Sequence, residues 1–271
     1  MKNKLVKAVV ILLISVLPIY NFINISSFTF CIAEEGFSET ADYSELTTIS
    51  LTETEKRING LYKTREDERE ARRLEEERKK RFELMKTQLQ QGELTYRRVF
   101  SDTLIVGDSL MQGLNTYKIL DSANMISMVS ASLYHLEGNV GTIIANNPQT
   151  LILHYGINML GNTSSQLDWF IEAYEEILSE LKPQLPDTKI FVSSIFNVSL
   201  DAATSYPNVR EYNAALSQMC SRQEVFFLDN DTCLTGTESY YGSDGIHVSK
   251  AFYNDVWLPH IFSTLYEYGA I

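Results

Sequence analysis

The stretch Leu104-Ile105-Val106-Gly107-Asp108-Ser109-Leu110 indicates the fold class of this chain. Residues 104–106 are apolar, which is typical of a fully buried strand, and Gly107, Asp108 and Ser109 turn the chain directly after it. A serine between a parallel strand and a helix lies in the crevice where open α/β sheets bind ligands. The unpaired N–H groups of the following helix would face an oxyanion there. Asp and Ser are also ordinary helix N-caps, so the stretch predicts either a cap or a nucleophile.

Residues 98–271 alternate short apolar segments with longer amphipathic ones, which is typical of a globular domain. The short segments are often β-branched and are the predicted strands: 104–106, 126–129, 151–155, 189–194 and 225–228. Helical patterns lie between and after them, at 111–120, 136–146, 165–181, 209–222 and 250–268. This alternation predicts βαβ units, a parallel sheet and an α/β fold. Pro183 and Pro186 are expected to end the third helix after Leu181.

The N-terminal segment, residues 1–33, has the composition of a targeting sequence. Three lysines precede an apolar run over 8–20, as in a secretory signal peptide. The apolar character continues through Ile32, so an uncleaved membrane anchor stays open as the alternative. In both cases the rest of the chain is exported. We therefore expect an extracytoplasmic protein, either secreted or anchored in the membrane.

Two further segments separate this N-terminus from the globular domain. Residues 34–50 are polar with no period and are expected to form a linker. Residues 51–97 are densely charged with mixed signs, which predicts a solvated helical stalk. Its broken apolar seam fits either a spacer or a homodimeric coiled coil.

The net charge of −12 is concentrated in the globular domain. From Val99 onward the chain has 19 Asp or Glu residues and 6 Lys or Arg residues. Such a surface repels polyanions, so we expect no nucleic acid among its partners. His135 and His260 lack neighbours at metal-ligand spacing, and His154 lies inside an apolar run and is expected in the core. We therefore expect neither a metal nor another cofactor.

A second polar turn, Tyr155-Gly156-Ile157-Asn158, follows the third predicted strand. Gly156 allows a tight turn, and the carboxyl ends of parallel strands meet at one edge of the sheet, so Asn158 is expected on the same edge as Ser109. A neutral N–H donor aimed at an oxyanion contributes about 3–4 kcal/mol to transition-state stabilisation. The alternative is that Asn158 only caps a helix or turns the loop.

A third polar turn, Ser243-Asp244-Gly245-Ile246-His247, precedes the C-terminal helix. Histidine is the side chain suited to take a serine proton near neutral pH. An aspartate three residues earlier can reach Nδ1 of His247, orient the ring and stabilise the imidazolium. Alone, such a motif is more often a surface turn. The order Ser109, Asn158, His247 along one parallel sheet favours catalysis.

These turns resemble the sequence blocks of the SGNH or GDSL hydrolases. Residues 107–110 match the first block, 156–158 resemble the third, and 244–247 match the fifth. Met159 stands where the third block commonly has Asp. The resemblance covers residues 100–271 and implies a flavodoxin-like, three-layer α/β/α sandwich with a parallel five-stranded sheet.

The resemblance also implies a role for each matching residue. Ser109 would be the nucleophile, His247 the general base and Asp244 the residue that orients it. Asn158 and the N–H of Ser109 would form part of the oxyanion hole. No metal or cofactor takes part in such a mechanism.

The second block of the family departs from its pattern in this chain. The family supplies a glycine N–H to the oxyanion hole there, whereas this chain reads Val129-Ser130-Ala131-Ser132. The N–H of Ser130 or Ala131 is expected to serve, provided that the turn needs no positive φ. Asp108 and Gly156, which belong to the first and third blocks, are expected to contact the substrate.

The sequence therefore predicts an exported serine esterase or deacylase that works through an acyl-enzyme. Its expected substrate is an acylated carbohydrate of the envelope or extracellular space, or a lipid. An acyltransferase to a sugar hydroxyl uses the same residues, and a non-catalytic binding or scaffold protein is a third interpretation. Tyr134, His135, Tyr240 and Tyr241 flank the catalytic loops, where they either line the mouth of the site or pack.

Overall fold

The computed structural model describes residues 51–234, 236 and 238–271, with side chains from residue 56 onward. The predicted signal peptide or anchor, residues 1–33, and the predicted linker, residues 34–50, lie outside the described residues. Within the described part of the chain, no helix is long and apolar enough to cross a membrane.

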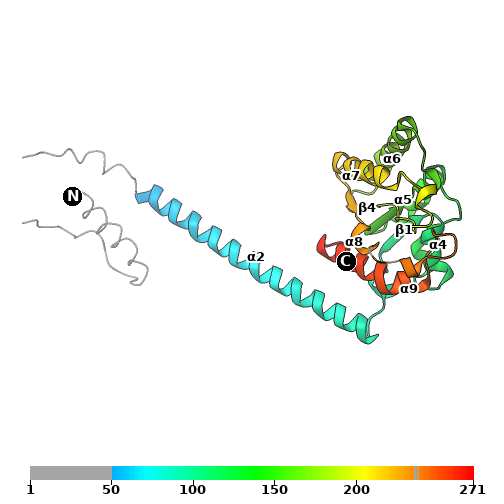
Figure 1. Cartoon of the computed structure of the whole chain (residues 1–271). Helices are drawn as coiled ribbons and strands as arrows, with labels where there is room; N and C mark the ends of the chain where they lie inside the picture. Colours follow the sequence, from blue (N-terminus) through cyan, green and yellow to red (C-terminus); the bar gives the residue numbers. More distant parts are fainter. Residues whose placement is uncertain (1–50, 235, 237) are drawn as a thin grey trace, which may run out of the picture. The chain divides into compact units, whose positions relative to one another are not determined.

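A parallel five-stranded sheet forms the centre of the fold (Figure 1). Its strands are β1 (Thr103–Gly107), β2 (Met125–Ser127), β3 (Thr150–His154), β4 (Lys189–Ser193) and β5 (Phe226–Leu228). Every residue of β1 and β3 is buried, because these strands are covered on both faces. All five predicted strands are confirmed, with bounds that differ by a few residues.

The strand order is β2-β1-β3-β4-β5, which is the flavodoxin-like order. β1 pairs with both β2 and β3, and Gly107 lies opposite His154 at the end of the β1–β3 ladder. The winding direction of the sheet reverses between β1 and β3. Open α/β sheets bind their ligands outside the carboxyl ends of the strands at this reversal.

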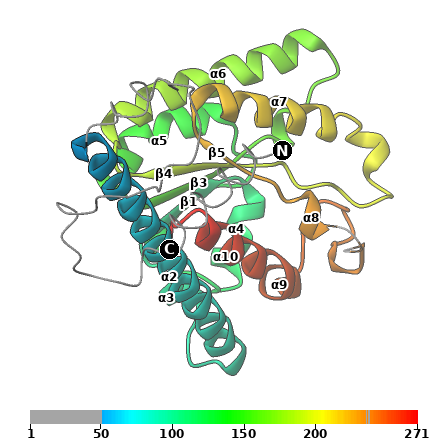
Figure 2. The ribbon, with the colours of Figure 1, turned by 90° about the vertical axis from the view of Figure 1, so that its left-hand side faces the viewer.

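Helices cover both faces of the sheet and make a three-layer α/β/α arrangement (Figure 2). α5 (Leu133–Asn146), α6 (Ser164–Gln184) and α7 (Val209–Gln223) lie on one face. α4 (Ser109–Thr116) and α10 (Leu258–Glu267) lie on the other. The shorter helices are η4 (Ser122–Asn124), η5 (Ile157–Met159), η6 (Ala203–Ser205), α8 (Asp231–Leu234), η7 (Glu238–Tyr240) and α9 (Lys250–Phe252).

The predicted end of the third helix is wrong by one turn. α6 continues through Pro183 to Gln184, and the N–H of Leu185 bonds to the carbonyls of Leu181 and Lys182. A proline this close to the end of a helix removes only one backbone hydrogen bond, and the next residues restore the pattern. The helix therefore stops before Pro186 instead of before Pro183.

The predicted C-terminal helix contains a π-helical turn, η8 (Tyr253–Trp257), between α9 and α10. Two aromatic side chains of this turn donate hydrogen bonds to segments that follow β1 and β5. The hydroxyl of Tyr253 donates to the carbonyl of Leu110, and Nε1 of Trp257 donates to Oδ1 of Asn230 at 3.0 Å. A π-helical turn is rare and is found mostly near functional sites.

The densely charged segment forms a long helix, α2 (Leu51–Gln91), followed by α3 (Tyr96–Val99). The chain divides into two compact units between Glu68 and Arg69. Within the second unit, Phe82 of α2 stacks on Phe262 of α10 with ring centroids 5.1 Å apart. The last turns of the predicted stalk are thus packed against the α/β domain. Its role as a spacer or coiled coil stays a prediction.

Candidate active site

Ser109 is the first residue of α4 and follows directly on β1. Asp108 caps the helix, because its Oδ1 accepts from the N–H of Leu110 at 3.0 Å. Gly107 has no room for a side chain, since a Cβ would meet Met111 Cγ at 2.5 Å and the carbonyl oxygen of His154 at 2.8 Å. The turn therefore places Ser109 at the carboxyl edge of the sheet, at the N-terminus of a helix.

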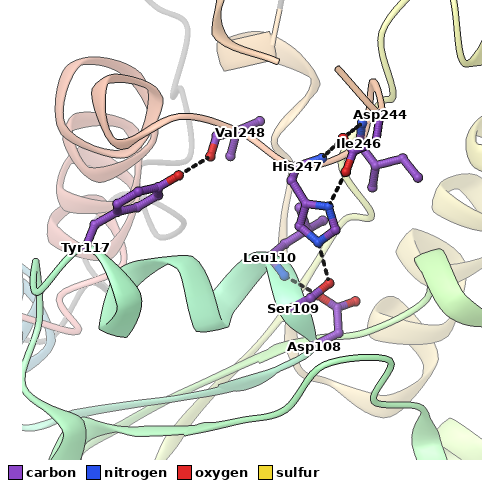
Figure 3. Close-up of polar contacts among 8 residues, drawn as sticks. All are labelled: Asp108, Ser109, Leu110, Tyr117, Asp244, Ile246, His247 and Val248. Carbon is purple, nitrogen blue, oxygen red and sulfur yellow. Dashed lines mark hydrogen bonds and ion pairs between the residues drawn. The ribbon is translucent and has the colours of Figure 1, made fainter. Parts of the chain in front are cut away.

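The loop before α9 brings His247 and Asp244 to this serine (Figure 3). Nε2 of His247 lies 3.0 Å from Oγ of Ser109, and its Nδ1 lies 2.7 Å from Oδ2 of Asp244. A proton on Nδ1 leaves Nε2 free to accept the serine hydroxyl proton. The structure thus joins the three residues of the predicted relay, with 138 positions between Ser109 and His247.

Asp244 is held as an anion by its own loop. Its Oδ1 accepts from the N–H groups of Ile246 and His247, both at 3.0 Å. Partial burial raises the pKa of Asp244, but these bonds and the bond from the His247 ring outweigh it and lower the pKa to about 2. Gly245 has φ +69, and a Cβ there would meet Oγ of Ser199 at 2.3 Å, so the tight loop requires glycine.

The relay is open to solvent. The side chains of His247 and Asp244 are 52% and 49% exposed, and Ser109 is half-buried. A cavity of about 540 Å³ lies beside Asp244, lined by residues that include Asp201, Glu238 and Tyr241. An open relay admits water and bulky substrates to the serine.

Asn158 lies in η5, on the loop that follows β3. Its Nδ2 donates to the carbonyl of Ala131 at 3.0 Å, and Sδ of Met159 accepts from the N–H of Leu133 at 3.1 Å. These two bonds join the Asn158 loop to the loop after β2. The predicted oxyanion-hole loops are therefore neighbours, and one N–H of the Asn158 amide is left for a ligand.

The turn of the second block does need a positive φ, contrary to the expectation from the sequence, because Ser130 has φ +57. This is the left-handed region that glycine adopts freely and other residues adopt at a cost of about 1–2 kcal/mol. The same loop conformation explains why a glycine suits this position. The N–H of Ala131 bonds to the carbonyl of Met128, whereas that of Ser130 has no partner among the described residues. Ser130 is thus the better candidate donor of the two.

The prediction that Asp108 and Gly156 contact the substrate does not fit their positions. Asp108 is 0% exposed, and Gly156 is buried with φ +147. A Cβ at Gly156 would meet Cδ1 of Ile195 at 2.3 Å, so its close packing allows only glycine. Both residues shape the turns that carry Ser109 and Asn158 instead.

The buried Asp108 carboxyl is unusual in one further respect. Its Oδ2 has no hydrogen-bond partner among the described residues. Burial raises the pKa of Asp108 to about 7, against the opposing effects of the Leu110 N–H bond and the charge of His247. The group next to Ser109 therefore binds a proton far more readily than an exposed aspartate.

A buried polar network beneath the site was missed from the sequence. Nδ2 of Asn230 donates to Oγ of Ser193 at 2.8 Å and to the carbonyl of Ser194 at 3.0 Å. Ser193 Oγ also lies 3.0 Å from Nδ1 of His154. His154 is confirmed as a core residue, and burial lowers its pKa to about 3. Its partners lie on separate strand ends, so no local sequence signal reveals them.

The residues flanking the catalytic loops divide between packing and exposure. Nδ1 of His135 accepts from the N–H of Ser132 at 3.0 Å and completes a capping box at the start of α5. Tyr240 packs edge-on against Phe252. Tyr134 is exposed.

The flavodoxin-like strand order, together with Ser109, His247 and Asp244 hydrogen-bonded at the carboxyl edge of the sheet, is the arrangement expected of an esterase of the GDSL type. The model of the GDSL-like lipase/acylhydrolase family matches residues 105–254, which is more than half of the chain. The chain belongs to this family and is an ester hydrolase by class. The resemblance found from the sequence is confirmed.

Three esterases or lipases are among the solved structures that are similar to this chain. An acetyl xylan esterase, AlAXEase, is 15% identical, with 60% of this chain and 99% of that chain covered and a TM-score of 0.46. A GDSL-like lipase from Bacteroides thetaiotaomicron is 14% identical, with 70% and 100% covered and a TM-score of 0.49. A carbohydrate esterase family 3 protein from Talaromyces cellulolyticus is 16% identical, with 61% and 96% covered and a TM-score of 0.47. A comparison with curated proteins gave no match.

Proposed function

We propose that this protein is an exported serine esterase that removes O-acyl groups from carbohydrate of the envelope or extracellular space. The observation that carries the proposal is the hydrogen-bonded relay, with 3.0 Å from Ser109 Oγ to His247 Nε2 and 2.7 Å from His247 Nδ1 to Asp244 Oδ2. Export rests on the lysine-rich and apolar residues 1–33, and the carbohydrate substrate on the acidic, open surface around the site.

In the first half-reaction, Ser109 Oγ attacks the acyl carbon and its proton passes to Nε2 of His247. The carbonyl oxygen becomes an oxyanion, stabilised by the N–H groups of Ser109 and Ser130 and the amide of Asn158. The C–O bond to the sugar then breaks, and the sugar oxygen takes the proton from His247. The product is an acyl-Ser109 ester and a free sugar hydroxyl.

In the second half-reaction, His247 takes a proton from water, and the hydroxide oxygen attacks the acyl carbon. The bond to Ser109 Oγ breaks, Ser109 regains its proton from His247, and a carboxylic acid leaves. Asp244 stays ionised throughout and stabilises the imidazolium of both steps. Its pKa of about 2 is consistent with this role.

The experiment is a Ser109→Ala substitution assayed with a short-chain aryl ester. Removal of a serine nucleophile lowers kcat by about 10⁴-fold or more, and labelling by an organophosphonate should disappear with it. Unchanged hydrolysis by Ser109→Ala would contradict the proposed nucleophile. An unlabelled, inactive wild-type protein would support the scaffold interpretation instead.

An acyltransferase with the same residues would need to exclude water from the acyl-enzyme. The half-exposed side chains of His247 and Asp244 favour water as the acceptor. Product analysis with an added sugar acceptor distinguishes the two activities. We expect free acid as the main product, whereas an acylated acceptor would assign the protein as a transferase.

A further inference from the structure

Two exposed aromatic side chains lie next to the loops of the candidate oxyanion hole. Tyr134 is 66% exposed and Trp169 is 41% exposed, and their ring centroids are 5.6 Å apart with an angle of 41° between the rings. Large aromatic side chains that are exposed together, with no core to pack against, often mark a binding surface. We call Tyr134 and Trp169 the aromatic pair.

The fold places the aromatic pair on the catalytic side of the sheet. Tyr134 is the second residue of α5, which begins at the carboxyl edge after β2. Trp169 is the sixth residue of α6, about 8 Å from the start of that helix at 1.5 Å per residue. The two helices run side by side on one face (Figure 2).

Hydrogen bonds connect the segment that leads into Tyr134 to the loop that carries Asn158. Asn158 Nδ2 donates to the carbonyl of Ala131, three residues before Tyr134. The N–H of Leu133, the residue directly before Tyr134, donates to Sδ of Met159. Tyr134 therefore borders the two neighbouring loops that carry the candidate oxyanion donors Ser130 and Asn158, and Trp169 lies beside Tyr134.

The groups around the aromatic pair are polar and acidic. Glu137 lies one helical turn after Tyr134, Glu172 lies one turn after Trp169, and Asp168 precedes Trp169; all three are exposed. Carboxylates accept hydrogen bonds from hydroxyl groups and repel anionic lipid headgroups and other polyanions. The C–H face of a pyranose ring is apolar with positively polarised edges and complements the negative face of an aromatic ring. This chemistry fits a neutral carbohydrate.

We infer that Tyr134 and Trp169 form a carbohydrate-binding platform that positions an acylated, neutral sugar chain over Ser109. The inference rests on the proposed function and adds the residues that recognise the sugar part of the substrate. The reaction is unchanged, and the aromatic pair contributes binding energy at a distance from the acyl carbon.

Tryptophan fluorescence provides a direct binding test. The chain has two tryptophans, and Trp257 is fully buried, so changes in exposed tryptophan emission report on Trp169. In Ser109→Ala, which binds without turnover, a short O-acetylated cello-oligosaccharide should shift the emission to the blue and protect it from acrylamide. Vesicles of phosphatidylcholine should do neither. An effect of the vesicles alone would overturn the inference in favour of a lipid surface.

Kinetics provide the second test, with the oligosaccharide and phenyl acetate compared in each variant. For each variant the measured quantity is kcat/KM for the oligosaccharide divided by kcat/KM for phenyl acetate. In Trp169→Ala and Tyr134→Ala this ratio should fall about tenfold, because KM for the oligosaccharide rises. Trp169→Phe keeps a ring and should recover part of the loss. An unchanged ratio in Trp169→Ala would overturn the inference.

Tyr268→Ala is the matched control. Tyr268 is 45% exposed, and the centroid of its ring lies 4.8 Å from that of Phe226. It is therefore also an exposed aromatic residue in a ring pair. Its carbonyl accepts from Lys189 Nζ at 2.7 Å, at the amino end of β4 and the opposite edge of the sheet. Its ratio should equal that of the wild type. Failure of the proposed function has a different signature, because phenyl acetate hydrolysis would then survive Ser109→Ala.

Discussion

Asp108 couples the stability of the fold to pH. Burial raises its pKa from 3.8 to about 7, so the folded state binds the proton more tightly than the unfolded state. The free energy of unfolding therefore decreases as pH rises from about 4 to about 7, by up to about 4 kcal/mol for a shift of this size. Above that range Asp108 is ionised in both the folded and the unfolded state, so its unfavourable contribution to the free energy of unfolding no longer changes with pH.

Asp108→Asn should remove this pH dependence, since an amide does not ionise and keeps an oxygen for the N–H of Leu110. We expect the stability of the variant relative to wild type to increase between about pH 4 and about pH 7. Urea unfolding across this range measures it. Asp187→Asn, which changes an exposed carboxylate, is the control and should follow the wild type. Parallel curves for Asp108→Asn and the wild type would contradict the raised pKa.

Ser130 occupies a left-handed conformation on the candidate oxyanion loop. Ser130→Gly should relieve about 1 kcal/mol of strain, partly offset by the greater freedom of glycine in the unfolded chain. We expect kcat to be retained or increased. Ser130→Val should lower kcat at least tenfold, because a β-branched residue resists this conformation and moves the donor.

Glu224→Gly is the control for this experiment. Glu224 has φ +53 at the end of α7, directly before the amino end of β5 and away from the site. It should relieve similar strain and leave kcat unchanged. Full kcat in Ser130→Val would remove the Ser130 N–H from the proposed oxyanion hole.

Among the elements, the end of α2 depends on α10 for its position. Phe82 stacks on Phe262 and lies 4.9 Å from the ring of Tyr266, whose hydroxyl donates to the carbonyl of Arg78 at 2.7 Å. The residues that make these contacts are about 180 positions apart in the sequence. The end of the charged helix therefore belongs to the hydrolase domain and contributes to its stability.

Phe82→Ala should lower the unfolding free energy by about 2 kcal/mol, because Phe82 is only partly buried. In a domain of this size the change corresponds to a decrease in Tm of about 5 °C. Leu84→Ala on the same helix is the control, since Leu84 is 58% exposed. Equal Tm values for the two variants would show that the contact with α10 is not stabilising in solution.

The helices and strands differ in how well the sequence predicts them. The five strands were predictable because each is a short apolar run between turn residues, which is a local property. The end of α6 was not, since the effect of Pro183 depends on how many hydrogen bonds follow it. The contact of Phe82 with α10 was hidden for another reason: the same charged composition is compatible with a solvated helix and with one held by a few aromatic contacts.

At the scale of the whole molecule, the acidic surface should select among substrates. From Val99 onward the excess of acidic residues generates a negative potential around the open site. For an ester that carries a negative charge, kcat/KM should increase several-fold between low and physiological salt, because ions screen the repulsion. A neutral ester with the same acyl group should show no such change. Equal salt responses of the two esters would contradict the electrostatic argument.

The sequence alone determined the fold class, the order of the strands along the chain and the three turns that carry polar side chains. These follow from apolar runs, amphipathic periods and glycine-containing turns, which act over a few residues. Ser109, Asn158, Asp244 and His247 were identifiable because each belongs to such a turn.

The tertiary structure alone decided how those turns meet. It set the distances of the Ser109–His247–Asp244 relay, the positive φ of Ser130 and the burial of Asp108. It also brought Tyr134 and Trp169 together on neighbouring helices. These properties depend on the packing of segments far apart in the chain, and packing distances are not encoded in any short stretch of sequence.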